Sequence, residues 1–223
     1  MIVKLFLLLI LGFTFQISES TDSIYEQNGE VRGVVQLPET RAVQSSPVGR
    51  YRRGVQRQAQ SQSPVLIWLV ERDQQHARQN DPVILDQQDL EFTPNIIAVR
   101  QNEVVRIRNS DPVYHNVFSL SSVKRFDVGR RPQGEYLDVK FEQQGVVDVF
   151  CDIHSNMHAT IYVVEPEMRS WTAGNSGDEF SLGSLPDGQY VLKIFSPGFS
   201  LYTSDLTVSE GEVKDLGTIT LRQ

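Results

Sequence analysis

The sequence predicts an all-β protein, because short runs of β-branched and aromatic residues recur between turn residues along most of the chain. After residue 20, no segment keeps apolar residues at the three-and-four spacing of a helix over the length of a helix. The 223 residues are 39% hydrophobic and 22% charged, which is a globular composition. That length is enough for one large domain or two modest ones.

Charge and cysteine content exclude several classes of function. The net charge of −7 argues against nucleic acid as a partner, since phosphate binding needs a basic surface. The single cysteine, Cys151, excludes an intramolecular disulfide framework, a CxxC redox pair and a zinc site built from several cysteines. Four histidines are too few for an oxidase that holds several copper ions.

Residues 1–20 predict a secretory signal peptide. Lys4 gives a positive start, residues 5–15 are almost all apolar, and small residues follow around Glu19. The apolar run is too short for a membrane span, which needs about 20 residues, so we expect no stable membrane span. An uncleaved N-terminal anchor is the alternative. We expect the mature protein in an oxidising compartment, periplasmic or extracellular.

Two strands are expected before residue 77, with a long connection between them. Apolar residues alternate over residues 31–37, which predicts a strand with one buried face. Residues 65–70 form a continuous apolar run around Trp68, which is typical of a strand buried on both faces. The intervening residues 39–63 are rich in Arg and Gln and predict a mobile loop, with a basic docking tail as the alternative.

Further strands follow in two blocks separated by Glu165 and Pro166. The first block is expected at residues 83–85, 96–99, 104–107, 116–120, 137–141, 146–151 and 160–164. The second block is expected at residues 179–182, 190–195, 204–208 and 217–221, with a turn at residues 186–188.

A group of sulfur and imidazole side chains indicates a metal centre. Cys151, His154 and Met157 follow a C-x2-H-x2-M spacing, and His115 lies beside an earlier strand. One thiolate, two imidazoles and a weak thioether are the ligand set of a mononuclear electron-transfer copper. Strand alternation places Cys151 on the same inward face as Val147 and Val149, and it also turns Met157 inward.

Each of these residues also has a purely structural interpretation. A buried Cys usually behaves as a small hydrophobe, and a Met at the start of a strand usually belongs to a core. A histidine such as His154, taken alone, is more often an ordinary loop residue than a metal ligand. Two histidines are left over: His158 is expected to face solvent, with metal binding as the less favoured alternative, and His76 has no visible partner.

Residues 83–165 resemble the cupredoxins, in particular plastocyanin and amicyanin. The matching stretches are residues 90–99, 104–107, 109–111, 115–117 and 145–157. The resemblance implies a Greek-key sandwich with one copper ion held by His115, Cys151, His154 and Met157. It also implies that the Asn116 side chain braces the ligand loop. Ile153 stands where many members have Pro, so their reduction potential does not carry over.

The flanking segments resemble a carboxypeptidase regulatory-like, prealbumin-type β-sandwich. Residues 29–35 with 64–69 look like its start, and residues 172–194 look like its later part. Two strands alone cannot bury a hydrophobic face, so residues 21–77 and 168–223 are expected to form one sandwich around a cupredoxin domain at 81–165. Two consecutive domains are the alternative. Exported proteins described as methylamine-utilisation-like show a similar arrangement.

These observations favour an exported type 1 (blue) copper protein that shuttles single electrons between redox partners. His154 is the expected electron port, where a protein redox partner docks. Four residues are expected to line an apolar patch around it: Pro112, Val113, Tyr114 and Ile153. No catalytic set stands out, so we do not expect an enzyme. The alternatives are a copper buffer or delivery protein and a structural or adhesive β-sandwich module.

Overall fold

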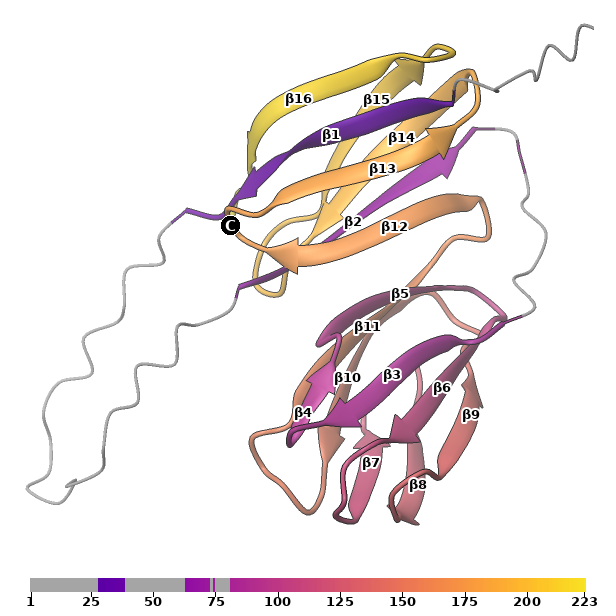
Figure 1. Ribbon diagram of the computed structural model, residues 1–223, viewed down its shortest axis with the longest axis vertical. Helices are drawn as coiled ribbons and strands as arrows, with labels where there is room; N and C mark the ends of the chain where they lie inside the picture. The colour runs from indigo at the N-terminus through magenta and orange to yellow at the C-terminus, as the bar shows by residue number, and fades with distance from the viewer. Residues whose placement is uncertain (1–27, 39–62, 73, 75–80) are drawn as a thin grey trace, which may run out of the picture.

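The computed structural model describes residues 28–38, 63–72, 74 and 81–223, and these form sixteen β-strands in four sheets with no helix among them (Figure 1). The all-β prediction is confirmed. The predicted signal peptide at residues 1–20, nearly all of the loop predicted at 39–63, and His76 lie outside the described residues.

The first sandwich is built from residues 83–164. Its strands are β3 (Val83–Gln88), β4 (Glu91–Thr93), β5 (Ile96–Arg100), β6 (Val104–Asn109), β7 (His115–Ser119), β8 (Phe126–Arg131), β9 (Tyr136–Lys140), β10 (Gly145–Cys151) and β11 (His158–Val164). One sheet has the order β5-β11-β10-β7-β8 and the other β4-β3-β6-β9. The parallel pairs β3 with β6 and β5 with β11 require the chain to cross between the sheets. This is the sandwich that the cupredoxin resemblance implied.

The second sandwich draws its strands from both ends of the described chain. They are β1 (Gly29–Gln36), β2 (Pro64–Glu71), β12 (Met168–Asn175), β13 (Glu179–Leu185), β14 (Gly188–Phe195), β15 (Tyr202–Val208) and β16 (Val213–Thr220). The sheet orders are β13-β1-β16 and β12-β2-β14-β15. Strands β1 and β2 therefore pair only with strands that follow the first sandwich in sequence.

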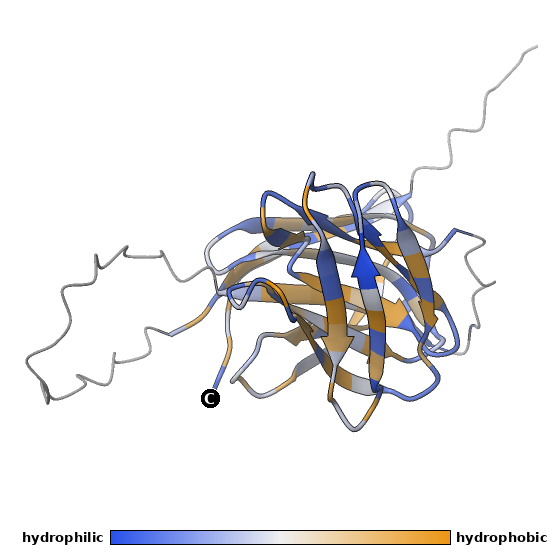
Figure 2. Ribbon diagram, turned by 90° about the horizontal axis from the view of Figure 1, so that it is seen from below, coloured by the Kyte–Doolittle hydropathy of each residue, from blue (hydrophilic) through white to orange (hydrophobic). Residues whose placement is uncertain are grey.

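Alternation of side chains explains both cores. Buried and more exposed residues alternate strictly along β1, and the change from hydrophobic to hydrophilic along many strands is visible in Figure 2. The first core is centred on residues such as Phe141, Val149 and Ile161, and the second on residues such as Tyr190 and Leu192. Each sandwich therefore has its own hydrophobic core.

Strand β2 joins the two sandwiches because both of its faces are buried, as its continuous apolar run predicted. Ile67 and Leu69 face the second core, whereas Leu66 and Trp68 face a third cluster shared with β5 and β11 of the first sandwich. The Trp68 ring lies 5.2 Å from the ring of Tyr162 on β11, centroid to centroid.

Polar contacts reinforce this junction. The nearly buried Arg100, at the end of β5, donates from Nε to the main-chain oxygen of Met168 at 2.7 Å and pairs with Glu103 at 3.1 Å. Glu165 pairs with Lys193 and accepts a hydrogen bond from the Trp68 indole. A buried ion pair is tolerated only when its hydrogen bonds are satisfied, so these contacts favour one docking geometry.

Three strands were not expected from the sequence, each for a physical reason. Strand β4 has only three residues. Strand β8 lies at a sheet edge, buries only Val128 and contains Gly129 at a φ of 70°. Strand β12 is half-buried along most of its length because it lies at the junction of the sandwiches, so its residues do not alternate.

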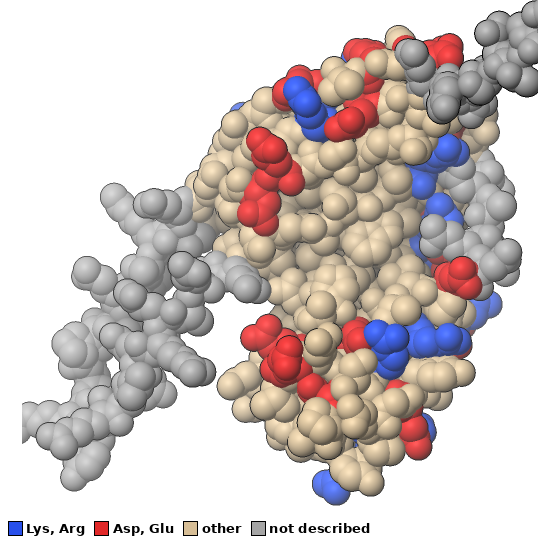
Figure 3. Space-filling model, viewed as in Figure 1, with Lys and Arg blue, Asp and Glu red and all other residues tan. Residues whose placement is uncertain are grey.

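The surface carries charges of both signs. On the face seen in Figure 3, acidic and basic side chains are interspersed and neither sign dominates. Several of them are paired across strands, as in Arg32 with Asp215 and Arg106 with Asp138. Among the described residues, no helix is long and apolar enough to cross a membrane.

Replacing Gly33 with Ala should destabilise the second sandwich. A Cβ at Gly33 would lie 2.9 Å from the main-chain oxygen of Gly217 and 3.1 Å from the Phe180 ring, both from the C-terminal segment. We expect a loss of about 1–3 kcal/mol in the free energy of unfolding, measured by chemical denaturation. Gly183→Ala is the matched control, since no described atom lies within 4 Å of its added Cβ. Equal effects of the two substitutions would contradict the pairing of β1 with β13 and β16.

Candidate metal centre

The sulfur donor lies at the end of the central strand of the larger sheet. Cys151 is the last residue of β10, and it shares the buried face of that strand with Val147 and Val149, as predicted. Its neighbour β7 pairs with β10 in the register Cys151 with Val117. That register brings the start of β7, where His115 lies, to the same end of the sandwich.

The loop between β10 and β11 is tied down by three main-chain hydrogen bonds. The Met157 N–H donates to the oxygen of His154 at 3.1 Å, and the Cys151 N–H donates to the oxygen of Met157 at 3.4 Å. The Asp152 N–H donates to the oxygen of Asn116 on β7 at 2.9 Å. The half-buried His154 is therefore held above β7 by backbone contacts on both sides of it.

Three donor atoms converge at this end of the sandwich. The Cys151 sulfur lies 3.5 Å from Nδ1 of His115 and 3.8 Å from Nδ1 of His154, and the two Nδ1 atoms are 3.1 Å apart. Cys151 and His115 are buried. Within the described residues this is the only group of three or more potential His, Cys, Asp or Glu ligands that lies close enough together to hold an ion.

These spacings fit a single transition-metal ion. In protein sites, nitrogen and sulfur donors lie about 2.0 and 2.3 Å from the ion, so donors arranged around it are about 3.3–3.7 Å apart. The observed separations of 3.1–3.8 Å are close to that range. One thiolate with two imidazoles suits copper, because sulfur stabilises Cu(I) and imidazole accepts either oxidation state.

Met157 lies where the sequence predicted. Its side chain is 1% exposed and belongs to the same hydrophobic core as Cys151. The short loop thus returns it to the interior directly after His154. Its role as an axial ligand stays a prediction.

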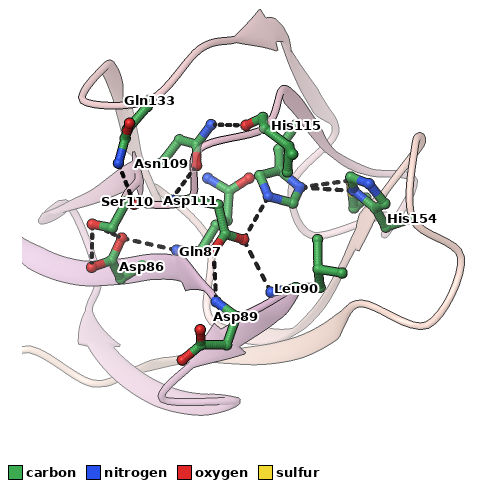
Figure 4. A network of polar contacts seen from close by, with 12 residues as sticks. Asp86, Gln87, Asp89, Leu90, Asn109, Ser110, Asp111, His115, Gln133 and His154 are labelled. Carbon is green, nitrogen blue, oxygen red and sulfur yellow. Dashed lines mark hydrogen bonds and ion pairs between the residues drawn. The ribbon is translucent and has the colours of Figure 1, made fainter.

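A buried carboxylate holds the far side of the His115 ring (Figure 4). Nε2 of His115 lies 2.8 Å from Oδ2 of Asp111. Burial alone would raise the pKa of the Asp111 carboxyl, but hydrogen bonds from Leu90 N–H, His115 and Asp89 N–H outweigh it, so the pKa lies below its ordinary value. An ionised carboxylate only accepts hydrogen bonds, which assigns the imidazole proton to Nε2. The Nδ1 lone pair then faces Cys151 and His154.

Asn109 anchors the segment that carries these residues. It is fully buried, and its side-chain amide donates to the main-chain oxygens of Val113 at 2.7 Å and Arg131 at 2.9 Å. Its side-chain oxygen accepts the N–H of Asp111 at 2.9 Å. One side chain therefore ties Asp111 and Val113 to the end of β8, where Arg131 lies.

Asn116 contributes through its backbone. The resemblance implied a bracing role for its side chain, but its buried Oδ1 has no hydrogen-bond partner among the described residues. The contact with the ligand loop runs from the N–H of Asp152 to the main-chain oxygen of Asn116.

His158 lies outside the donor group. Its ring is exposed, lies 3.0 Å from Asp148 through Nε2 and stacks on Phe150 at a centroid distance of 4.9 Å. The expectation that it faces solvent is confirmed.

Sequence reasoning gave no role to Asp111 or Leu90. The available signal was the spacing of Asp111, which precedes His115 by four residues in a loop. Leu90 was not linked to the site because its N–H reaches Asp111 across 21 positions of sequence.

Part of the chain is similar to copper proteins of known structure. A mutant of amicyanin matches with a TM-score of 0.36 and 17% identity, over 39% of this chain and 86% of that one. A copper-containing nitrite reductase from Thermus scotoductus matches with a TM-score of 0.38 and 21% identity, over 42% of this chain and 26% of that one. A purple cupredoxin from Nitrosopumilus maritimus matches with a TM-score of 0.34 and 18% identity, over 37% of this chain and 99% of that one.

No protein-family model and no curated protein matches the chain. The TM-scores of the structural matches are 0.34–0.38, so the fold and the chemistry of the site have to follow from this chain's own residues.

Replacing Asn109 with Ala should destabilise the protein strongly. The change removes one buried and two half-buried hydrogen bonds and leaves two carbonyls and one N–H without their partner. We expect a loss of roughly 3 kcal/mol in the free energy of unfolding. Asn116→Ala is the control and should cost less than roughly 1 kcal/mol, because its Oδ1 has no partner to lose among the described residues. Equal losses of unfolding free energy in denaturant titrations of the two variants would contradict the three hydrogen bonds of the Asn109 side chain.

Proposed function

We propose that the chain is an exported type 1 copper protein that carries single electrons between protein redox partners. The observation that supports this most directly is the convergence of the Cys151 sulfur with Nδ1 of His115 and Nδ1 of His154. We assign these three residues as strong ligands of one copper ion and Met157 as the weak fourth. When bound, that ion supplies a Cu(I)/Cu(II) couple.

Each ligand has a distinct task in this proposal. Cys151 and His115 are held rigidly by the register of β10 and β7 and by burial, which limits movement of the donors when the charge of the ion changes. His154 is half-buried whereas Cys151 and His115 are buried, so we assign His154 as the residue through which an electron reaches the surface. Four protein donors leave no open position for a substrate, so we propose a carrier and not an enzyme.

Exposed apolar side chains near the ligands support docking of a protein at this end. Val113 is 40% exposed, Tyr114 58% and Ile153 38%. Leu90, 48% exposed, joins them, because its N–H is bonded to the same Asp111 oxygen as His115. We call Leu90, Pro112, Val113, Tyr114 and Ile153 the docking patch. A small apolar surface of this kind suits short-lived encounters between redox proteins.

The location and the domain division belong to the same proposal. The charged start and short apolar run of residues 1–20 support export to the periplasm or the extracellular space. The pairing of β1 with β13 and β16, and of β2 with β12 and β14, supports a cupredoxin domain at 81–165 inserted into a second sandwich formed by 21–77 and 168–223.

Addition of one equivalent of Cu(II) to the purified protein should produce an intense visible absorption band from thiolate-to-copper charge transfer. Cys151→Ser should abolish the band, since it removes the only thiolate in the chain. His158→Ala is the control and should keep it, because that ring lies outside the donor group. A wild-type protein that stays colourless, or a band that survives Cys151→Ser, would rule out the type 1 site. A coloured protein that hands Cu(I) to a chelator faster than it exchanges electrons would favour copper delivery instead.

A charge placed in the docking patch should slow electron exchange without changing the colour of the copper-loaded protein. We expect Val113→Glu to lower the rate of electron self-exchange roughly tenfold, equivalent to about 1.4 kcal/mol, because two like charges must meet in the encounter. NMR line broadening in mixtures of the oxidised and reduced protein measures this rate. Leu201→Glu, at a leucine that is 43% exposed on the second sandwich, should have no such effect. Equal rates in the two variants would place the electron port elsewhere.

A further inference from the structure

We propose that Asp111 is a positioning residue for the metal centre, which fixes the orientation and tautomer of His115 and lowers the reduction potential of the bound ion. This inference rests on the proposed function and deepens it. The copper ion itself would not touch Asp111, whose effect passes through the imidazole ring.

The contact is built to be rigid. The His115 side chain is 0% exposed and the Asp111 side chain 6%, and Nε2 and Oδ2 are 2.8 Å apart. The Asp111 carboxylate also accepts the N–H groups of Asp89 at 2.6 Å and Leu90 at 3.0 Å. Three hydrogen bonds therefore hold it, while Asn109 holds its backbone N–H. Neither the ring nor the carboxylate is free to rotate.

The same carboxylate also stabilises the turn at residues 89–90. Asp89 and Leu90 both have left-handed backbone angles, with φ of 57° and 62°, which side-chain-bearing residues seldom adopt. Their N–H groups point together at Asp111 (Figure 4). The two N–H groups thus bond to the Asp111 carboxylate instead of to water. Together with His115, they hold the carboxylate through three hydrogen bonds.

No Lys or Arg side chain of the described residues pairs with Asp111. Its hydrogen-bond partners among the described residues are two backbone N–H groups and His115. Asp86, a second carboxylate of the same network, differs because Arg108 pairs with it. The unpaired negative charge is therefore directed at the ligand ring.

A buried negative charge behind a ligand favours the more positive state of the ion. A carboxylate that accepts the far N–H of a ligating imidazole makes the ring a stronger donor and fixes its tautomer. The electrostatic attraction between the carboxylate and the copper ion is stronger in a buried site than in water. Cu(II) carries one more positive charge than Cu(I) and gains more from Asp111, and this difference lowers the potential.

The test uses the full chain with Asp111→Asn, which keeps the shape of the side chain and removes its charge. We expect Cu(II) affinity to fall about 10- to 100-fold, the range found for partners of metal-bound ligands, and Cu(I) affinity to fall less. Each tenfold fall in the ratio of Cu(II) to Cu(I) affinity raises the potential by about 59 mV. Competition with chelators gives the affinities, and voltammetry gives the potential.

Asp89→Asn is the matched control. It removes one negative charge from the neighbouring turn, where the Asp89 side chain is exposed and only its backbone N–H contacts Asp111. Asn tolerates the left-handed backbone of this position. The affinity ratio should stay within about twofold of the wild type, since exposed charges are screened. An unchanged ratio in Asp111→Asn, or an equal change in Asp89→Asn, would overturn the inference.

A copper-free measurement separates this inference from the proposed function. Nitrogen-15 NMR of the metal-free wild-type protein reports which His115 nitrogen carries the proton, and we expect Nε2. A proton on Nδ1 would overturn the role of Asp111 even if the protein turns blue with copper. A wild-type protein that has the Nε2 proton but binds no copper would support the positioning contact and refute the proposed function.

Discussion

The pairing of β10 with β7 is the constraint on which the candidate metal centre depends. It aligns Phe150 with Phe118 and Cys151 with Val117, so that the end of one strand meets the start of the other. Side chains alternate along a strand, and a shift of one residue would turn the Cys151 thiol away from the core and separate it from His115. The hydrogen bond from Asp152 to the oxygen of Asn116 then places the loop that carries His154.

The polar side chains at this end of the sandwich hold different parts of the site. Asn109 fixes the backbone around Asp111, and Asp111 in turn fixes the His115 ring and the turn at residues 89–90. The hydrogen bonds from Asp111 to Asn109 and to His115 are buried and the others are half-buried. In a buried place an unmade hydrogen bond costs more than a made one contributes. The orientation of the His115 ring is therefore set from the side opposite its Nδ1 donor atom.

The second sandwich supports the first through one strand with two buried faces. Trp68 on β2 packs against the sheet that carries β10 and β11, whereas Leu69 on the same strand packs into the second core. The buried contact from Arg100 to the main chain of Met168 adds a directional bond to this apolar junction. Because the junction covers β5 and β11, it leaves the end of the sandwich with His154 accessible.

The sequence alone determined the all-β class, the strands with clear alternation and the inward direction of Cys151 and Met157, because these follow from local periodicity. It also singled out His115 and His154 as potential donors from residue type and spacing. Strands β4, β8 and β12 escaped prediction, since they are short, at a sheet edge or half-buried at the junction, and none of these properties leaves a pattern in the sequence.

Only the tertiary structure decided that the three donors lie within 3.8 Å of one another and that Asp111 stands behind His115. It also decided that Asn116 contacts the loop through its backbone. These facts depend on strand register and on contacts between residues far apart in sequence. Hydrogen bonds and cross-sheet packing are made between side chains and backbone groups that only the folded chain brings together.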